Sequence, residues 1–224
     1  MNSNFFDKAR ANMVNNQLLP NGVKNSDLIE SFDNTKKELF VPDSEKEVVY
    51  SDSDILISPD RYLVRTFVLA KMFEHCSFSK DDSVLVIGCL TGYSVAIISN
   101  LVSYVFGVEN CKKLVESANS VLSHMGCLNT SVFYKSNLVL GNNKNAPYDK
   151  IFIEGAVKSV PKVLIKQLKD NGEIFTVLKE EDYIGEFVRG QKIGSHISFT
   201  KLFNTNLYEL KDFIIQENGY EKSL

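Results

Sequence analysis

Two glycines and a glutamate have spacings typical of a turn that binds a nucleotide-like ligand. Gly88 directly follows the apolar run 84–87, Gly92 comes four residues later, and Glu109 ends a second apolar run, 104–108. Glycine permits a sharp turn and lets a ligand approach without meeting a Cβ. A carboxylate at the end of the next strand can accept hydrogen bonds from both hydroxyls of a ribose. The pattern predicts a strand, turn and helix that present backbone N–H groups to a ligand, with Glu109 binding the ribose.

The glycine spacing fits known fingerprints only in part. In the dinucleotide pattern G-x-G-x-x-G, Leu90 and Tyr93 replace the second and third glycines, whereas the G-x-G-x-G of S-adenosylmethionine enzymes loses only the second. We place Gly88, Cys89, Gly92 and Tyr93 at this turn, and we expect Cys89 to fill space in it rather than to act as a nucleophile. An ordinary turn without a ligand remains an alternative, because a pair of glycines is a weak signal.

The composition is that of a globular protein: of the 224 residues, 44% are hydrophobic and 24% are charged. A net charge of −3 gives no support for a nucleic-acid partner held by bulk electrostatics. No apolar run has membrane-spanning length, and the N-terminus lacks the apolar core of a signal peptide. The four cysteines form no C-x-x-C pair, and the three histidines are isolated. We therefore expect a cytoplasmic protein with no membrane partner, no nucleic-acid partner and no metal.

The order of elements predicts an α/β fold. Helical patterns cover 5–19, 26–32 (with Ser26 as a candidate N-cap) and 66–76, and a short strand covers 55–57. From Ser83 onward strands and helices alternate, which is typical of a parallel sheet. Strands are expected at 83–87, 104–109, 130–134, 149–154 and 173–178, helices at 111–125 and from Pro161 up to Asn171, and an antiparallel hairpin at 183–188 and 197–203.

Several short motifs resemble those of the protein-L-isoaspartate O-methyltransferase family. They are R-x-x-M-V-x-x-Q-L at 10–18, F-V-P at 40–42, the glycine segment VLVIGCLTGY at 84–93, A-P-Y-D at 146–149, and Val160-Pro161 with Gln167-Leu168. The resemblance covers about residues 10–178 and is better to a divergent bacterial branch of the family. It implies a Rossmann-like class I methyltransferase fold, with a mostly parallel seven-stranded sheet and an N-terminal helical cap.

The resemblance also implies a function. The donor would be S-adenosylmethionine, and the acceptor would be the isoaspartyl carboxylate of a damaged protein or peptide. Residues 1–76 would form the cap and the substrate-side segment, 77–215 the donor-binding domain, and 216–224 a tail. Asn137 or its neighbour stands where an acid near the adenine is common, so Asn137 joins the expected donor-binding residues.

The departures from the family pattern fall on functional positions. Val86 replaces an acidic residue, and Leu90 replaces a glycine. In the segment that supplies catalytic hydroxyls in the family, Tyr62 stands for threonine and Val64 for serine. We expect Tyr62, Arg61 and Arg65 to act on the substrate side, with either arginine able to clamp a carboxylate. Isoaspartyl methylation is expected to be weak, with Val64→Ser as its test. Surface roles for both arginines, a binding protein without catalysis, and a methyltransferase with a small-molecule acceptor remain alternatives.

Overall fold

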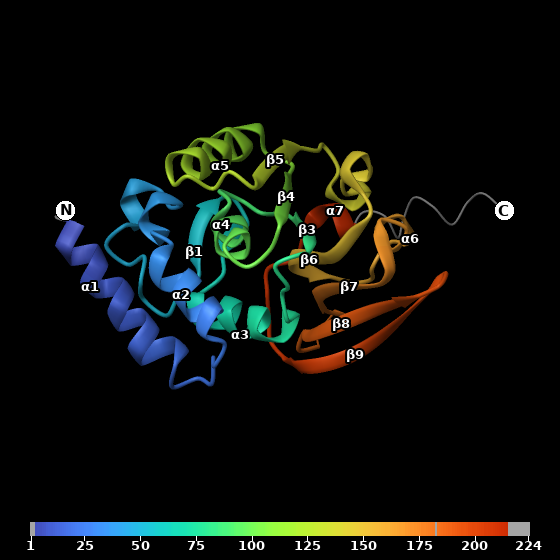
Figure 1. Cartoon of the computed structure of the whole chain (residues 1–224), viewed down its shortest axis with the longest axis horizontal. Coiled ribbons are helices and arrows are strands. Elements are labelled where there is room, and N and C mark those ends of the chain that lie inside the picture. The colour runs from blue at the N-terminus through green and yellow to red at the C-terminus, as the bar shows by residue number, and fades with distance from the viewer. Residues whose placement is uncertain (1–2, 182, 215–224) are drawn as a thin grey trace.

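A computed structural model describes residues 3–181 and 183–214, so the expected tail, 216–224, lies outside the described residues. The chain builds a seven-stranded sheet of order β5-β4-β3-β6-β7-β8-β9 with helices on both faces (Figure 1). The strands are β3 (Ser83–Ile87), β4 (Tyr104–Glu109), β5 (Thr130–Tyr134), β6 (Tyr148–Val157), β7 (Leu168–Leu178), β8 (Glu186–Ile193) and β9 (His196–Asn204). The first five strands in spatial order run parallel, and β8 and β9 add an antiparallel hairpin at one edge.

The remaining elements cover the sheet or precede it. The helices are α1 (Ser3–Met13), α2 (Ser26–Asn34), α3 (Thr66–Cys76), α4 (Tyr93–Ser99), α5 (Lys112–His124), α6 (Lys162–Ile165) and α7 (Lys211–Ile214). Shorter turns are η1 (Val14–Leu18), η2 (Lys37–Leu39), η3 (Asp43–Glu45), η4 (Leu138–Leu140) and η5 (Asn143–Asn145), and β1 (Ile55–Ser58) pairs with β2 (Arg61–Leu63) in a small hairpin. The bounds of α3, β3, β4 and β5 match the predicted ones residue for residue. The first strand of the hairpin was predicted wrongly at 183–188, because β8 pairs along β7 as far as Ile193.

Strand β3 shows why both faces of the sheet are apolar. Val84 and Val86 point into the larger core, which the N-terminal helices, α3, α4 and α5 share, whereas Leu85 and Ile87 point into a smaller core with α6 and α7. Side chains alternate between faces along a strand, so a continuous apolar run is what a strand buried on both sides requires. The carboxyl end of β3 therefore meets those of β4 and β6 inside the sheet.

Two local predictions are corrected by the structure. Asn25, not Ser26, caps α2, because its side-chain oxygen accepts a hydrogen bond of 3.0 Å from the Leu28 N–H. The helix expected from Pro161 ends at Ile165, and β7 begins at Leu168. The carbonyl of Gln167 accepts a hydrogen bond of 2.8 Å from the Tyr148 N–H, which starts sheet pairing where the sequence suggested further helix.

Candidate functional site

The carboxylate of Glu109 lies at the centre of the candidate site. It ends β4, and its side chain is fully buried. Oε1 accepts hydrogen bonds from the backbone N–H groups of Asn110 (2.8 Å) and Cys111 (3.2 Å), and Oε2 accepts one from that of Leu90 (3.0 Å). Backbone donors from two neighbouring loops therefore fix the carboxylate beside the glycine turn.

Arg61, at the start of β2, forms a bidentate ion pair with this carboxylate. Its Nη1 lies 3.2 Å from Oε1 of Glu109, and its Nη2 lies 2.9 Å from Oε2. Nη2 also donates to the carbonyl oxygen of Gly88 at 3.1 Å. Only 16% of the Arg61 side chain is exposed. The β1–β2 hairpin thus places a largely buried cation directly over the turn between β3 and α4.

The two glycines of this turn are needed for different reasons. Gly88 has φ +76°, and a Cβ there would lie 3.3 Å from Cδ2 of Leu210 and 3.4 Å from Nη2 of Arg61. Gly92 has φ +89°, and a Cβ there would lie 3.3 Å from Ala118 and Leu122 of α5. Gly92 therefore serves the packing of α5, whereas Gly88 lets two side chains of the same protein come close to the backbone.

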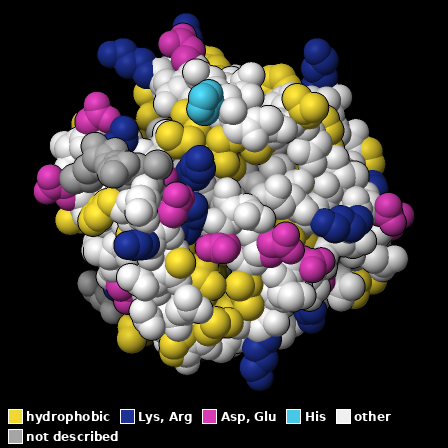
Figure 2. Space-filling view, turned by 60° about the vertical axis from the view of Figure 1, so that its left-hand side comes forward, with side chains coloured by type: hydrophobic (Ala, Val, Ile, Leu, Met, Phe, Trp, Pro, Cys, Tyr) yellow, Lys and Arg dark blue, Asp and Glu magenta, His cyan; other side chains and the backbone are white. Residues whose placement is uncertain are grey.

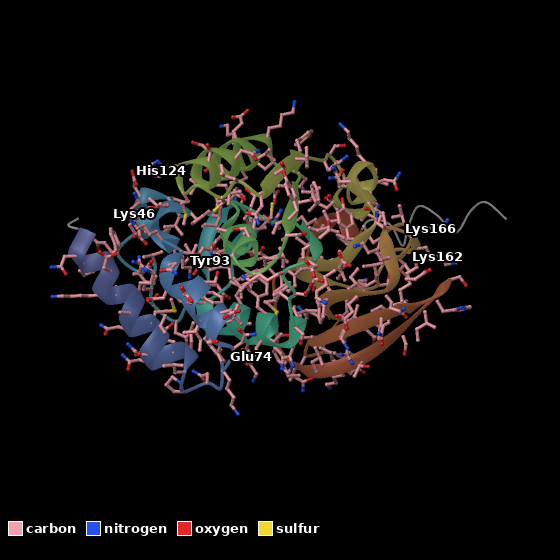
Figure 3. All side chains as sticks on the ribbon, in the orientation of Figure 1. Lys46, Glu74, Tyr93, His124, Lys162 and Lys166 are labelled. Carbon is pink, nitrogen blue, oxygen red and sulfur yellow. The ribbon has the colours of Figure 1, made fainter. Side chains whose placement is uncertain are left out.

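The other residues of the turn point into the core. Cys89 is buried, and a Cβ on Gly107 would lie 2.9 Å from its Sγ; burial raises the pKa of the Cys89 thiol, which keeps it protonated. This favours the space-filling role over the nucleophilic one. Leu90 (φ +51°) is buried in the larger core, and its backbone N–H is the part that faces Glu109. Tyr93 packs edge-on against Phe32 and Phe40, between the N-terminal helices and α4 (Figure 3).

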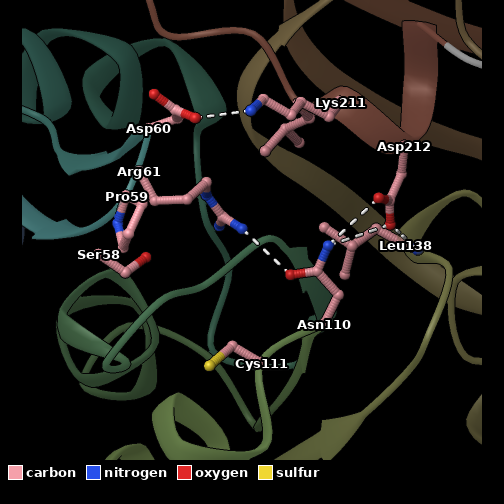
Figure 4. Close-up of a pocket in the computed structure, with 10 residues that line it drawn as sticks. Ser58, Pro59, Asp60, Arg61, Asn110, Cys111, Leu138, Lys211 and Asp212 are labelled. Atoms are coloured by element: carbon pink, nitrogen blue, oxygen red, sulfur yellow. Dashed lines mark hydrogen bonds and ion pairs between the residues drawn. The ribbon is translucent and has the colours of Figure 1, made fainter.

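A cleft of about 210 Å³ opens beside Arg61 (Figure 4). On its far side Asp212 of α7 accepts hydrogen bonds from the side-chain amide of Asn110 (3.2 Å) and from the backbone N–H of Leu138 (2.8 Å). An exposed ion pair between Lys211 and Asp60, 2.6 Å long, joins α7 to the turn of the β1–β2 hairpin. The lining residues are Ser58, Pro59, Asp60, Arg61, Asn110, Cys111, Leu138, Leu210, Lys211 and Asp212. Asn137 is adjacent to this lining and accepts a hydrogen bond from the Val139 N–H, which caps η4.

Glu154, within β6, is a second buried carboxyl group and interacts electrostatically with Arg61 and Glu109. Its Oε2 accepts a hydrogen bond of 2.5 Å from the hydroxyl of Ser94, while its Oε1 has no hydrogen-bond partner among the described residues. Desolvation raises its pKa to about 7, against the effect of the Arg61 charge, which lowers it. The lone acidic residue in the apolar segment 151–156 was the available signal for this group in the sequence, and our prediction missed it.

Tyr62 and Arg65 border a different surface from Arg61. The ring of Tyr62 stacks on that of Tyr208, with 3.8 Å between centroids and 12° between planes. The backbone N–H of Arg65 donates to Oδ1 of Asp54 at 2.9 Å, and its Nε donates to the same oxygen at 3.2 Å. These residues flank an open groove of about 450 Å³ lined by Asp54, Arg65, Lys179, Asn206, Leu207, Tyr208 and Glu209.

Val64 lies between the two arginines and turns the opposite way. Its side chain is 4% exposed and belongs to the larger apolar core. A serine hydroxyl at this position would point into that core and not into the groove. The predicted gain of methylation from Val64→Ser therefore loses its structural basis.

Comparison with known proteins identifies the family. Residues 9–207 match the family model described as protein-L-isoaspartate(D-aspartate) O-methyltransferase. The chain belongs to this family. A protein-L-isoaspartate O-methyltransferase 2 of Shewanella sediminis is 33% identical over 167 residues, which are 75% of this chain and 68% of that protein. One of Pelobacter propionicus is 28% identical over 182 residues, which are 81% of this chain and 80% of that protein.

Solved structures agree with the fold of this family. A protein-L-isoaspartate O-methyltransferase superposes with a TM-score of 0.83 at 21% identity, covering 93% of this chain and 69% of that one. A Plasmodium falciparum structure described as a protein-L-isoaspartate O-methyltransferase in complex with S-adenosyl-L-homocysteine gives 0.78 at 19% identity, covering 91% and 98%. At these identities the likeness concerns the fold, a Rossmann-like sheet with helices on both faces.

Binding of the family's donor requires a carboxylate for the ribose beside a glycine turn. Glu109 and Gly88 are residues of the required types. Glu109 and Gly88 lie together, as the sequence spacing predicted, but Arg61 bridges them and Leu210 lies against Gly88. Leu210 and Asp212 were not predicted, because no pattern in the sequence brings 207–212 next to β3 and β4. Asn110 was also missed, although its place directly after Glu109 was a signal in the sequence. Within the described part of the chain, no group of three or more His, Cys, Asp or Glu residues could hold a metal ion, and no helix is long and apolar enough to cross a membrane.

Proposed function

We propose that this chain is an S-adenosylmethionine-dependent protein-L-isoaspartate O-methyltransferase, which methylates the isoaspartyl carboxylate of damaged proteins. The observation that carries the proposal is the buried carboxylate of Glu109, fixed beside the Gly88 turn in a chain whose family match spans residues 9–207. The N-terminal helices, with the β1–β2 hairpin, form the substrate-side cap of the proposed enzyme.

S-adenosylmethionine, when bound, supplies a methyl group activated by its positively charged sulfur. In our assignment Glu109 accepts hydrogen bonds from the ribose hydroxyls, and the backbone at Gly88 and Cys89 faces the methionine side. Asn110 and Asn137 lie on the side left for the adenine. The complex of the Plasmodium falciparum neighbour with S-adenosyl-L-homocysteine supports a ligand of this class in the fold.

The acceptor side needs little proton chemistry. A carboxylate is already ionised at neutral pH, so the protein mainly has to align one of its oxygens with the methyl carbon. As the new C–O bond forms, the C–S bond breaks, and its electron pair stays on sulfur. We assign the acceptor to the groove beside Arg65, whose guanidinium is held by Asp54 and is still 43% exposed. Lys179 also lines this groove, where it pairs with Glu209 at 3.1 Å. The ring of Tyr208, on which Tyr62 stacks, is the aromatic part of the lining.

The surface is compatible with varied protein substrates. Lysine, arginine, aspartate and glutamate side chains are interspersed on the face shown in Figure 2, without a block of one sign. An enzyme that recognises a damaged backbone in many proteins gains nothing from a strongly charged surface, which would select partners by charge. The expectation of a cytoplasmic location remains a prediction.

The test is methyl transfer from labelled S-adenosylmethionine to two peptides of one sequence, with isoaspartate or aspartate at a single position. We expect label only in the isoaspartyl peptide. Glu109→Gln should weaken donor binding tenfold to a hundredfold, because charge-assisted hydrogen bonds contribute roughly 1.5–3 kcal/mol. Transfer to neither peptide by the folded wild-type protein, at saturating donor, would contradict the proposal.

A further inference from the structure

The space over Gly88 is filled by side chains of the protein itself. A glycine at the end of a central parallel strand leaves room for a ligand to approach the backbone. Here the atoms nearest to a Cβ at that position are Cδ2 of Leu210 and Nη2 of Arg61. Gly155, in β6, faces the same side chain, since a Cβ there would lie 2.5 Å from Cγ of Leu210. Both glycines thus accommodate Leu210.

Arg61 is paired with the two carboxylate oxygens of Glu109 that the proposed ribose contact requires. Both carboxylate oxygens of Glu109 are paired with its guanidinium, and each also accepts at least one backbone hydrogen bond. A ribose diol would donate to the same two oxygens. The pair is bidentate and mostly shielded from water, the geometry in which such hydrogen bonds are strong. The ribose and Arg61 therefore exclude each other from Glu109.

The segment that carries Leu210 is anchored to the sheet. The Leu210 N–H donates to the Ala156 carbonyl at 3.0 Å, and the Ala156 N–H donates to the Tyr208 carbonyl at 2.9 Å. Beyond Leu210, Asp212 accepts hydrogen bonds from the Leu138 N–H and the Asn110 side-chain amide, which are the polar groups on the proposed adenine side (Figure 4). Leu210 is 3% exposed. The segment therefore reaches from Gly88 and Gly155 to the polar groups on the proposed adenine side.

The cleft that these side chains leave open is small. The cleft of about 210 Å³ beside Arg61 is below the roughly 300–1,000 Å³ of pockets that enclose ligands of this size. The residual opening is bridged by the exposed Lys211–Asp60 pair, which costs little to break because water screens it.

We propose that Arg61 and Leu210 set the donor affinity of this protein, because they occupy the positions that the ribose and the adjoining part of the donor need. This rests on the proposed function and adds to it that donor binding is a displacement. Donor binding then requires Arg61 to leave Glu109 and the segment 207–212 to leave β6. The apparent Kd is then the intrinsic Kd divided by the fraction of molecules in which the site is open.

The experiment is calorimetric titration of S-adenosylhomocysteine, the unreactive product of the donor, into the full chain. Leu210→Ala removes the uncharged occupant, and its matched control is Leu164→Ala in α6, which deletes an equally buried leucine from the same core but does not lie over Gly88 or Gly155. Arg61→Met removes the charged occupant, and its control is Arg189→Met, which breaks an arginine–glutamate pair with Glu173 on the neighbouring strand of the sheet. We expect Leu210→Ala and Arg61→Met each to bind on the order of tenfold tighter than wild type, and both controls to match wild type.

Hydrogen exchange supplies a second readout. Saturating S-adenosylhomocysteine should accelerate exchange of the Ala156 and Leu210 amides. The Ala156 N–H loses its bond to the Tyr208 carbonyl, and the Leu210 N–H loses its bond to the Ala156 carbonyl, when the ligand enters. Equal affinity in wild type, Leu210→Ala and Leu164→Ala, with these amides unchanged or slowed, would overturn the displacement while leaving the proposed function intact. An absence of binding in wild type and in both opened variants, at millimolar ligand, would instead overturn the proposed function itself.

Discussion

Arg61 and Arg65 lie four residues apart, and each is paired with a carboxylate, yet the two pairs are physically different. The Arg61–Glu109 side chains are 16% and 0% exposed, whereas the Arg65–Asp54 side chains are 43% and 19% exposed. Breaking a buried pair leaves an uncompensated charge away from water, which is strongly destabilising. An exposed pair exchanges its partner for water at little cost. Burial, not residue type, therefore separates a structural arginine from one that is free to bind a new partner.

The comparison also shows how one short hairpin serves two sides of the site. Arg61 starts β2 and faces the sheet ends, Tyr62 turns outward to Tyr208, and Val64 turns into the core. Arg65 precedes α3 and faces the groove. Alternation separates Arg61 from Tyr62 within β2, whereas Val64 and Arg65 follow the strand, where the chain turns into α3.

The largest effect should come from Arg61→Met in the absence of donor. The free energy of unfolding should fall by about 3 kcal/mol, the lower end for a broken buried pair, because three backbone N–H groups still bind Glu109. Urea unfolding followed by circular dichroism measures it. The double variant Arg61→Met with Glu109→Gln should recover much of the loss, since it removes the stranded charge. A loss below 1 kcal/mol would show that the Arg61 pair behaves like the exposed one.

A second test concerns Glu154, the other carboxyl group near Arg61. Its pKa of about 7 in the folded protein exceeds its ordinary value of 4.5, so the folded state retains a proton that the unfolded chain has lost between these two pH values. Stability from this group is therefore full below pH 4.5 and is lost as pH rises through 7, by roughly 3 kcal/mol. Glu154→Gln should flatten the stability profile between pH 5 and pH 7 relative to wild type. Glu116→Gln, exposed on α5, is the control. If Glu154→Gln leaves the stability profile unchanged, Glu154 does not retain a proton in the folded protein between these pH values.

Val64→Ser tests the inward direction of the residue between the arginines. A hydroxyl buried without a partner costs roughly 1–3 kcal/mol, so the variant should unfold at lower urea concentration than wild type. Its methylation rate should not rise, because the hydroxyl does not reach the groove. A faster rate with unchanged stability would mean that the segment 61–65 can turn Val64 toward the acceptor.

The sequence predicted the order of elements well because apolar periodicity and glycine position carry that information locally. Strand β3 and helix α3 follow from patterns confined to each segment, and so does the presence of a hairpin after β7, although not the bounds of β8. The content of the site was less accessible. Whether Arg61 binds a substrate or Glu109 depends on the register of the β1–β2 hairpin over the sheet, and the place of Leu210 depends on a return of the chain to β6 after β9. Both are contacts between distant segments, which no local pattern encodes.

The smallest effect on stability should come from Arg65→Met. Its pair with Asp54 is partly exposed, so the free energy of unfolding should change by less than about 1 kcal/mol. If Arg65 binds the acceptor carboxylate, the KM for the isoaspartyl peptide should nevertheless rise tenfold to a hundredfold, because a charge-assisted hydrogen bond contributes roughly 1.5–3 kcal/mol. Donor affinity should not change, since Arg65 does not contact Glu109 or the glycine turn.

Lys201→Met, which breaks a similarly exposed pair with Glu186 on the β8–β9 hairpin, is the control. It should leave stability, KM and donor affinity at wild-type values. An unchanged KM in Arg65→Met would move the acceptor away from this groove, and an altered donor affinity would show that the two arginines belong to one site after all.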